Sequence, residues 1–351
     1  PEKLIEWVAR KEGTRTYFSA QFARVYGQPI ERAWSEWLAW EREFQHRNLA
    51  RLAESPLTPW RPVGPRTLGS ISRPCLDPAS RKVYLGVNYP GQAPHLAALD
   101  LATGKMEKLC DVRGGAKYMV TSPALDRQRG RLYYTTDNND WRDLYVYDLK
   151  RKRSRRLMNN ERVGDLAFNA ADDSLWGVRH DNGISTLVRI PPPYDRWQQV
   201  HSWPFGTDFY DLDIAPGGDR LTGALTHIDG SQELVCYETA RLLAGEAVPE
   251  VLGDFANNSP ASFVFSADGR YLYGSSYYSG VANIYRYDFQ SKKIEPLTNT
   301  DTGFFRPLPL GDGNLLAFRY TATGFVPVLL QEAPVTRVNA ISFLGQRVVE
   351  G

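Results

Sequence analysis

The chain lacks the residues and motifs that would assign it to a familiar catalytic class. Its three cysteines, Cys75, Cys110 and Cys236, are odd in number and widely spaced, which matches neither a disulfide framework nor a metal knuckle. We expect buried free thiols. The sequence contains neither a His-Glu-x-x-His motif nor a Gly-x-Ser-x-Gly elbow. It therefore offers no zinc-peptidase helix and no serine nucleophile of the hydrolase type.

Long apolar runs and an excess of charge of one sign are also missing. No stretch approaches the roughly 20 apolar residues of a membrane span, and no signal peptide stands at the start. The 42 Lys and Arg and the 40 Asp and Glu give a formal net charge of +2, which creates no global attraction to nucleic acid or to an anionic membrane. We expect no nucleic-acid partner. Because the chain opens Pro-Glu-Lys, without methionine, we expect a piece of a longer protein.

Aromatic residues and a helical start are what the sequence does contain. The 351 residues include 9 Trp, 19 Tyr and 15 Phe, which is ample for a packed interior. Residues 1–54 show a helical pattern interrupted at Gly13 and Gly27, and this predicts three helices, the third with an apolar stripe that another surface must cover. Residues 55–70 hold four prolines, which disfavour helix and interior strand. We expect a linker there.

Beyond residue 70 the sequence repeats. The clearest unit runs from Ser262 to Tyr273 as strand, Asp268-Gly269 turn and strand, and a third strand follows at 283–289. Asp-Gly between alternating flanks is a hairpin signal, with both turn residues at positive φ. Related units recur every 43 to 51 residues, marked by the aligned positions Pro74, Pro123, Leu166, Leu212, Phe263 and Pro307.

Each unit offers four strands, the fourth of the last unit at 337–343. Six near-equal units of four strands at this period predict an all-β fold, a six-bladed β-propeller of four-stranded antiparallel blades over residues 71–344. Residues 345–351 then form a tail. Two segments, 63–71 and 338–344, remain candidates for the strand that seals the ring.

The fifth unit resembles a known repeat. The run Ser259-Pro-Ala-Ser-Phe-Val-Phe-Ser-Ala-Asp-Gly-Arg-Tyr-Leu-Tyr273, with the weaker Ser122-Pro-Ala-Leu-Asp and Leu144-Tyr-Val-Tyr-Asp-Leu, is similar to the repeat of TolB-like (WD-repeat-like) β-propellers. The resemblance implies a periplasmic or cell-envelope propeller that binds a protein or peptide partner at the mouth of its central channel. We expect a monomer that is non-catalytic by itself.

The helical start carries a second resemblance. The run Phe22-Ala-Arg-Val-Tyr-Gly-Gln-Pro-Ile-Glu-Arg-Ala-Trp-Ser-Glu-Trp37 is similar to the closing helices of bacterial gluzincin-like metallopeptidase domains. This implies that residues 1–54 are the tail of an upstream domain. Any zinc site of such a peptidase would lie before Pro1.

One residue of each first strand is predicted to face the channel axis. If the first strand of each blade is innermost, the residue before each marker joins a ring: Arg73, Ser122, Asp165, Asp211, Ser262 and Arg306. The two arginines fall on neighbouring blades, and so do the two aspartates. We predict a site for a peptide end or a zwitterionic ligand, with arginine holding a carboxylate. The alternative is that these charges are solvated, or that they pair across a wet channel and hold the blades together.

Other chemistries have weaker support. Asp165 and Asp211 also fit the paired carboxylates of a propeller glycosidase, although the other ring positions supply no third acid. Asp137-Asn-Asn-Asp140 with Asp143 has oxygen ligands for calcium but lacks the turn glycine and the distal glutamate. A polar hairpin loop is favoured, and we expect no cofactor.

The one basic run, residues 150–156, is expected to be a solvated hairpin. The five histidines lack metal-ligand spacing; they are His46, His95, His180, His201 and His227.

Overall fold

The computed structural model describes residues 2–9, 18–65, 67–112, 122–138 and 141–341. The chain divides into two compact units, one up to Glu54 and one from Ser55 onward. The first holds helices α1 (Glu2–Val8), α2 (Phe18–Tyr26) and α3 (Ile30–Leu52). Trp7 of α1 packs on α2, with its ring centroid 4.3 Å from that of Phe18 and its Nε1 donating to the Phe18 carbonyl at 3.2 Å. Among the described residues, no helix combines the length and the apolar character that crossing a bilayer requires.

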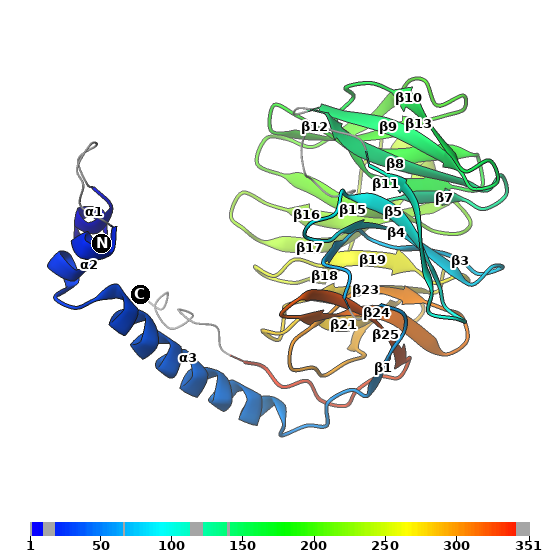
Figure 1. The fold of residues 1–351 in the computed structure, drawn as a ribbon. Coiled ribbons are helices and arrows are strands. Elements are labelled where there is room, and N and C mark those ends of the chain that lie inside the picture. The colour runs from blue at the N-terminus through cyan, green and yellow to red at the C-terminus, as the bar shows by residue number, and fades with distance from the viewer. Residues whose placement is uncertain (1, 10–17, 66, 113–121, 139–140, 342–351) are drawn as a thin grey trace. The chain divides into compact units, whose positions relative to one another are not determined.

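The second unit is a six-bladed β-propeller of antiparallel, four-stranded blades (Figure 1), which confirms the predicted fold class. The first blade consists of β2 (Ser70–Ile71) and β3 (Cys75–Asp77), which share the innermost position, followed by β4 (Lys82–Asn88), β5 (His95–Asp100) and β6 (Met106–Asp111). The second blade consists of β7 (Ala124–Asp126), β8 (Arg131–Asn138), β9 (Trp141–Asp148) and β10 (Arg153–Met158). The third blade consists of β11 (Val163–Asn169), β12 (Ser174–Asp181), β13 (Ile184–Ile190) and β14 (Gln198–Ser202).

The last three blades repeat the pattern. The fourth blade consists of β15 (Asp208–Ile214), β16 (Arg220–Thr226), β17 (Gln232–Glu238) and β18 (Glu250–Asp254), with helix α4 (Thr239–Leu243) inserted before β18. The fifth blade consists of β19 (Ala261–Phe265), β20 (Tyr271–Ser276), β21 (Asn283–Asp288) and β22 (Lys293–Pro296). The sixth blade contains β23 (Phe304–Pro309), β24 (Asn314–Thr321) and β25 (Gly324–Gln331). The sixth blade thus takes only three strands from its own repeat.

The ring is closed by a strand from the proline-rich segment. β1 (Trp60–Pro62) pairs antiparallel with β25 as the outermost strand of the sixth blade, so the fourth strand expected at 337–343 is not the one used. Beyond β1, the Val63 amide donates to the Pro327 carbonyl at 2.9 Å, and the Leu68 amide donates to the Phe325 carbonyl at 2.8 Å. β1 lies within the segment 55–70 that its prolines mark as a linker. A sheet edge tolerates Pro62, since that position needs no amide donor toward solvent.

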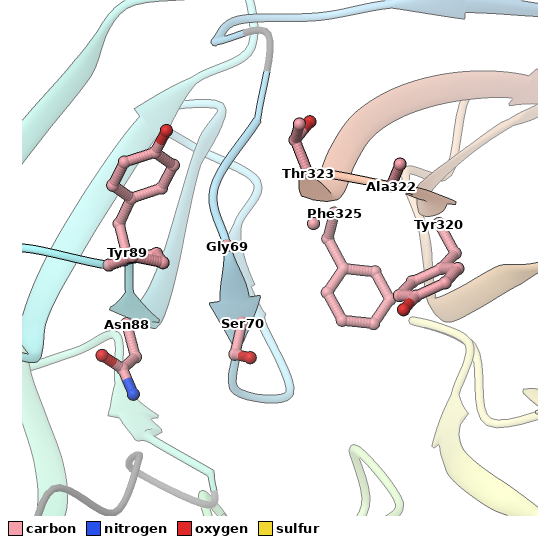
Figure 2. A pocket seen from close by; sticks show the side chains of 10 residues that line it. Gly69, Ser70, Asn88, Tyr89, Tyr320, Ala322, Thr323 and Phe325 are labelled. Carbon is pink, nitrogen blue, oxygen red and sulfur yellow. The ribbon is translucent and has the colours of Figure 1, made fainter. Parts of the chain in front are cut away.

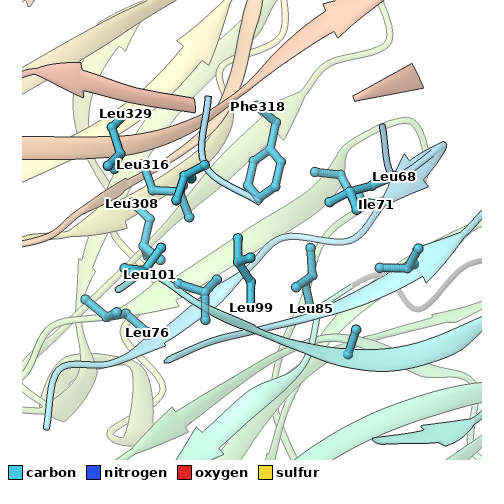
Figure 3. Close-up of a cluster of buried hydrophobic side chains, with 14 residues drawn as sticks. Leu68, Ile71, Leu76, Leu85, Leu99, Leu101, Leu308, Leu316, Phe318 and Leu329 are labelled. Carbon is cyan, nitrogen blue, oxygen red and sulfur yellow. The ribbon is translucent and has the colours of Figure 1, made fainter. Parts of the chain in front are cut away.

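A hydrophobic cluster fills the junction between the sixth and first blades, here called the seam (Figure 3). Leu85 and Leu99 of the first blade pack there with Leu316 and Phe318 of the sixth, and all four side chains are fully buried. Burial of apolar side chains of this size contributes about 1.5–3 kcal/mol each. The ends of the propeller are therefore joined by a core as well as by hydrogen bonds.

Two glycines of the fifth blade occupy positions where a side chain would be unfavourable. Gly269 lies at φ +71°, as the hairpin requires, whereas Asp268 keeps negative φ and accepts a hydrogen bond from the Arg270 amide at 3.1 Å. The expected pair of positive φ angles is thus reduced to one. In the second strand of the fifth blade, a Cβ on Gly274 would overlap the ring of Phe263. Glycine there lets the aromatic ring of the innermost strand lie flat against its neighbour.

Candidate functional site

β-Bulges set the direction of the predicted ring residues. In the last four blades the pairing of the innermost strand with the second strand shifts across two residues. The first of the two adopts a left-handed conformation in every case, at Asp165 (φ 46°), Asp211 (57°), Ser262 (54°) and Arg306 (52°). A bulge re-aims a side chain that would otherwise follow the alternation of the strand. The repeat alignment therefore selects structurally equivalent positions.

Hydrogen bonds link these positions across the channel. Arg73 donates to the Asp211 carbonyl at 3.2 Å and to the Leu166 carbonyl at 3.4 Å, so the side chain from the first blade reaches the third and fourth. The Asp211 amide donates to Asp165 Oδ2 at 3.2 Å, and Asp211 Oδ2 accepts from the Ser262 amide at 2.7 Å. The structure thus brings four of the six predicted residues into one connected network.

The remaining two ring residues differ from each other. Ser122 is buried and donates to the Leu166 carbonyl at 3.4 Å. Arg306 Nη1 is buried without a hydrogen-bond partner. Burial lowers the pKa of Arg306 to about 10, with the charge of Arg73 acting in the same direction and that of Asp211 opposing it. The arginine of the sixth blade is therefore the one ring charge that the network leaves uncompensated among the residues described.

Two carboxyl groups near the axis bind protons more tightly than usual. Burial, followed by the charge of Asp211, raises the pKa of Asp165, while Arg73 opposes the shift. Burial likewise raises the pKa of Asp213, whose Oδ2 accepts from the Phe265 amide at 2.9 Å. A carboxyl with a raised pKa is able to act as a proton donor. Asp211 instead accepts a hydrogen bond from the Ser262 amide through Oδ2 and belongs to the network described above.

A pocket opens beside the ring at the seam. The innermost strands all begin at one end of the channel, which we call the start mouth. Because successive strands of a blade alternate in direction, the loops between second and third strands also lie at the start mouth. There a cavity of about 620 Å³ is lined by Gly69, Ser70, Asn88, Tyr89, Pro90, Tyr320, Ala322, Thr323, Gly324 and Phe325. We call this cavity the seam pocket. None of its lining side chains carries a charge.

Aromatic rings form one wall of the seam pocket. Figure 2 shows Tyr320 and Phe325 on one side of the Gly69–Ser70 segment and Tyr89 with Asn88 on the other. The centroids of Tyr320 and Phe325 lie 5.5 Å apart, and Phe305 of the innermost strand lies 5.4 Å from Phe325. Since Phe305 precedes Arg306, this wall continues to the channel.

The walls of the seam pocket are held by a close approach of two backbones. Gly324 has φ +116°, and a Cβ there would lie 2.6 Å from Gly69 Cα. The Phe325 amide donates to the Gly69 carbonyl at 3.0 Å, and Thr67 Oγ1 donates to the Thr323 carbonyl at 2.7 Å. The pocket is thus formed by the same contacts that close the ring.

A serine, a histidine and an aspartate meet between the third and fourth blades without forming a nucleophilic triad. His180 Nδ1 lies 3.3 Å from Ser185 Oγ and 3.5 Å from Asp208 Oδ1, and Ser185 also hydrogen-bonds Asp208. In a catalytic triad the serine and the carboxylate contact opposite nitrogens of the imidazole. Here both contact Nδ1, and Ser185 is 2% exposed. These contacts therefore connect the third blade to the first strand of the fourth.

The other predicted sites have the following places. Asp143 is buried, and its carboxylate accepts from Arg156 Nη1 at 3.4 Å and from the Asn160 amide at 2.9 Å. The rest of the proposed calcium loop, the side chains of 137 and 138 and residues 139–140, lies outside the described part, and no metal-ligating cluster occurs among the residues described.

The basic run falls on the turn before β10 and on β10 itself, where its side chains are mostly exposed. The three cysteines are free, but only Cys236 is buried, whereas Cys75 and Cys110 are partly exposed, so the expectation of buried thiols is confirmed for Cys236 alone. Desolvation raises the pKa of the Cys75 thiol to about 12.

Comparison with known proteins gives the fold. No family model and no curated protein matches the chain. Solved structures that resemble it include TolB from Acinetobacter baumannii, with 12% identity, a TM-score of 0.48 and coverage of 77% of this chain. The chain spans 56% of that protein.

Two further structures superpose more closely. A putative TolB from Agrobacterium tumefaciens has 16% identity and a TM-score of 0.51, with 65% of this chain and 80% of that one covered. A calcium-binding protein, regucalcin, from the same organism has 14% identity and a TM-score of 0.56, with 82% and 98% covered. Identities this low show the fold alone, and they confirm the resemblance to TolB-like propellers at that level. The resemblance of the helices to a peptidase domain stays a prediction.

Sequence reasoning missed the seam pocket. Its two walls lie about 250 residues apart in the chain, and β1 had no recognisable strand pattern. One signal was present, because both tyrosines lie where the second strand of a blade ends: Tyr89 directly follows β4, and Tyr320 is the penultimate residue of β24.

Proposed function

We propose that this propeller binds an extended segment of a protein partner at the start mouth, with the seam pocket as the principal contact. The observation that supports this most strongly is the pocket itself: an aromatic, uncharged cavity of about 620 Å³ between the innermost strand of the first blade and the second and third strands of the sixth. Sites for ligands and peptides are concave and mostly apolar, with a few polar groups that fix orientation. Ser70, Asn88 and Thr323 supply such groups.

The ring is part of this proposal as the floor of the site. Most of its members hold one another, which makes the channel a rigid base and leaves Arg306 as the member able to take up a ligand. Rigid, preformed sites lose less conformational entropy on binding. A non-catalytic role for the chain by itself is part of the same proposal.

A peptide library displayed on phage and panned against the purified chain tests the proposal. We expect enriched sequences whose binding is weakened at least about tenfold by Tyr320→Ala or Tyr89→Ala, since one buried aromatic contact is worth more than about 1.4 kcal/mol. Phe205→Ala is the matched control, because Phe205 is an exposed aromatic residue on the loop between the third and fourth blades. Absence of enrichment, or equal weakening by Phe205→Ala, would contradict the proposal.

Location and assembly belong to the same proposal. The TolB-type repeat supports a periplasmic or cell-envelope protein, of which this monomeric propeller is one part. Fractionation of cells that produce the parent protein, with analytical ultracentrifugation of the purified chain, tests both statements. A cytosolic parent or a stable dimer would contradict them.

A glycosidase is the second candidate, and one observation favours it. The raised pKa of Asp165 suits a general acid. Asp211 would then act as the second carboxylate, although its Oδ2 already accepts the Ser262 amide. Hydrolysis of a glycoside panel by the wild type that is lost in Asp165→Asn would establish this candidate and overturn the non-catalytic role.

A further inference from the structure

The arginine of the sixth blade, Arg306, is partly buried and has a terminal nitrogen without a hydrogen-bond partner. Among the described residues, Arg306 Nη1 is buried and unpartnered, and the group that its guanidinium faces is the Phe325 ring, whose centroid lies 6.0 Å from Cζ. Its neighbour on the ring, Arg73, donates to two carbonyl oxygens instead of to a carboxylate. Two positive charges thus meet near the axis, and one of them has free donors.

Other partly buried arginines of the propeller show what is unusual about Arg306. Arg179, Arg286 and Arg319 also bury an Nε without a partner. Each of them nevertheless holds a carboxylate through a terminal nitrogen, at 2.7 to 3.0 Å. Arg306 lacks that compensation. A buried donor without a partner is rare in native proteins and requires an explanation, of which ligand binding is one.

The carboxylates near Arg306 do not neutralise it. Asp211 is the acidic group that acts on it electrostatically, but Asp211 Oδ2 is taken by the Ser262 amide at 2.7 Å. Asp165 titrates at a raised pKa because it is buried beside Asp211. An incoming anion therefore meets two guanidinium groups, with Asp211 as the opposing charge.

Arg306 lies directly behind the wall of the seam pocket. Its Cζ is 6.0 Å from the ring centroid of Phe325, which lines the pocket. We propose that Arg306 binds a carboxylate of the partner's peptide, either an acidic side chain or the free C-terminus, while neighbouring uncharged residues of that peptide occupy the seam pocket. This inference rests on the proposed function and names its ligand chemistry. Guanidinium and carboxylate match in geometry and charge.

The first test uses the peptides enriched by the wild-type chain. Each is synthesised with a free or amidated C-terminus and with each Asp or Glu replaced by its amide. One of these changes should weaken binding about ten- to hundredfold, the range for loss of a charge-assisted hydrogen bond that leaves a buried partner unpaired. Arg306→Gln should weaken the unmodified peptide equally and leave the neutralised peptide unaffected. Arg155→Gln, an exposed arginine on β10, is the matched control.

The second test needs no peptide. Sodium acetate should raise the melting temperature of the wild type above that in sodium chloride at equal concentration, and Arg306→Gln should abolish the difference. Arg306→Gln should itself melt at the wild-type temperature or higher, because it removes an uncompensated buried charge.

The outcomes separate the two proposals. Enriched peptides that bind equally with and without their carboxylates, or that ignore Arg306→Gln, overturn this inference and leave the seam pocket as a site. Absence of enrichment overturns both. An acetate effect that persists in Arg306→Gln places the anion elsewhere and also contradicts the inference.

Discussion

The two sides of the channel ring are built from the same bulge but have opposite character. On the side of the third to fifth blades, Asp165, Asp211 and Ser262 are joined by hydrogen bonds between a carboxylate and the next backbone amide. On the side of the sixth blade, Arg306 has the same left-handed conformation, but its Nη1 has no hydrogen-bond partner among the described residues. We call the hydrogen-bonded side the locked side and the side of Arg306 the open side. The difference indicates that the locked side stabilises the ring, and we propose that the open side binds the partner.

The largest effect on stability should come from a substitution on the open side, at the seam, where the backbones of Gly324 and Gly69 lie close together. Gly324→Ala adds a Cβ 2.6 Å from Gly69 at a φ of +116°, so we expect a loss of about 3 kcal/mol or more in the free energy of unfolding. Gly311→Ala is the control, since Gly311 has φ +76° with nothing within 4 Å and should cost only about 1–2 kcal/mol. Urea unfolding measures both. Equal losses would show that the seam does not depend on this approach.

The locked side should respond to loss of a hydrogen bond. Asp211→Ala leaves the Ser262 amide without its acceptor, and we expect a cost of about 1–3 kcal/mol. Asp211→Asn retains an acceptor oxygen and should cost less. Arg306→Gln, on the open side, should cost nothing. If Arg306→Gln destabilised the chain as much as Asp211→Ala, the two sides would not differ.

The pH dependence should sharpen the comparison further. The folded pKa of Asp165 is raised, so its carboxyl holds its proton longer in the folded than in the unfolded chain. The stabilisation from that proton is complete below the unfolded pKa and is lost as the pH rises through the folded value. Asp165→Asn removes this loss, and its melting temperature should exceed that of the wild type more at pH 7 than at pH 4. A constant difference between the two pH values would contradict the shift.

The smallest effect is expected far from the ring. Arg155→Ala alters the exposed strand β10, and the free energy of unfolding should change by less than about 0.5 kcal/mol. Peptide binding should be unaffected as well. A clear loss of either would mean that the basic run takes part in folding or in the site.

The sequence was sufficient to predict the blades and the ring because both repeat. Strand alternation recurs in six units that are spaced by 43 to 51 residues, and the left-handed residue of each bulge falls at the same place in the alignment. The closing strand could not be predicted, since Trp60–Pro62 pairs with residues of the last repeat and is too short and proline-rich to show alternation. The seam pocket depends on that pairing, and the unpaired state of Arg306 depends on which blades meet across the axis.

Photo-crosslinking tests most directly whether the open side is the binding side. An enriched peptide that carries a diazirine next to its carboxylate is irradiated with the wild-type chain, and the adducts are mapped by mass spectrometry. The account predicts adducts on the walls of the seam pocket, around Tyr89 and residues 320–325, with loss of labelling in Arg306→Gln. Labelling centred on Asp165 and Asp211, or on the loop that carries Phe205, would contradict it.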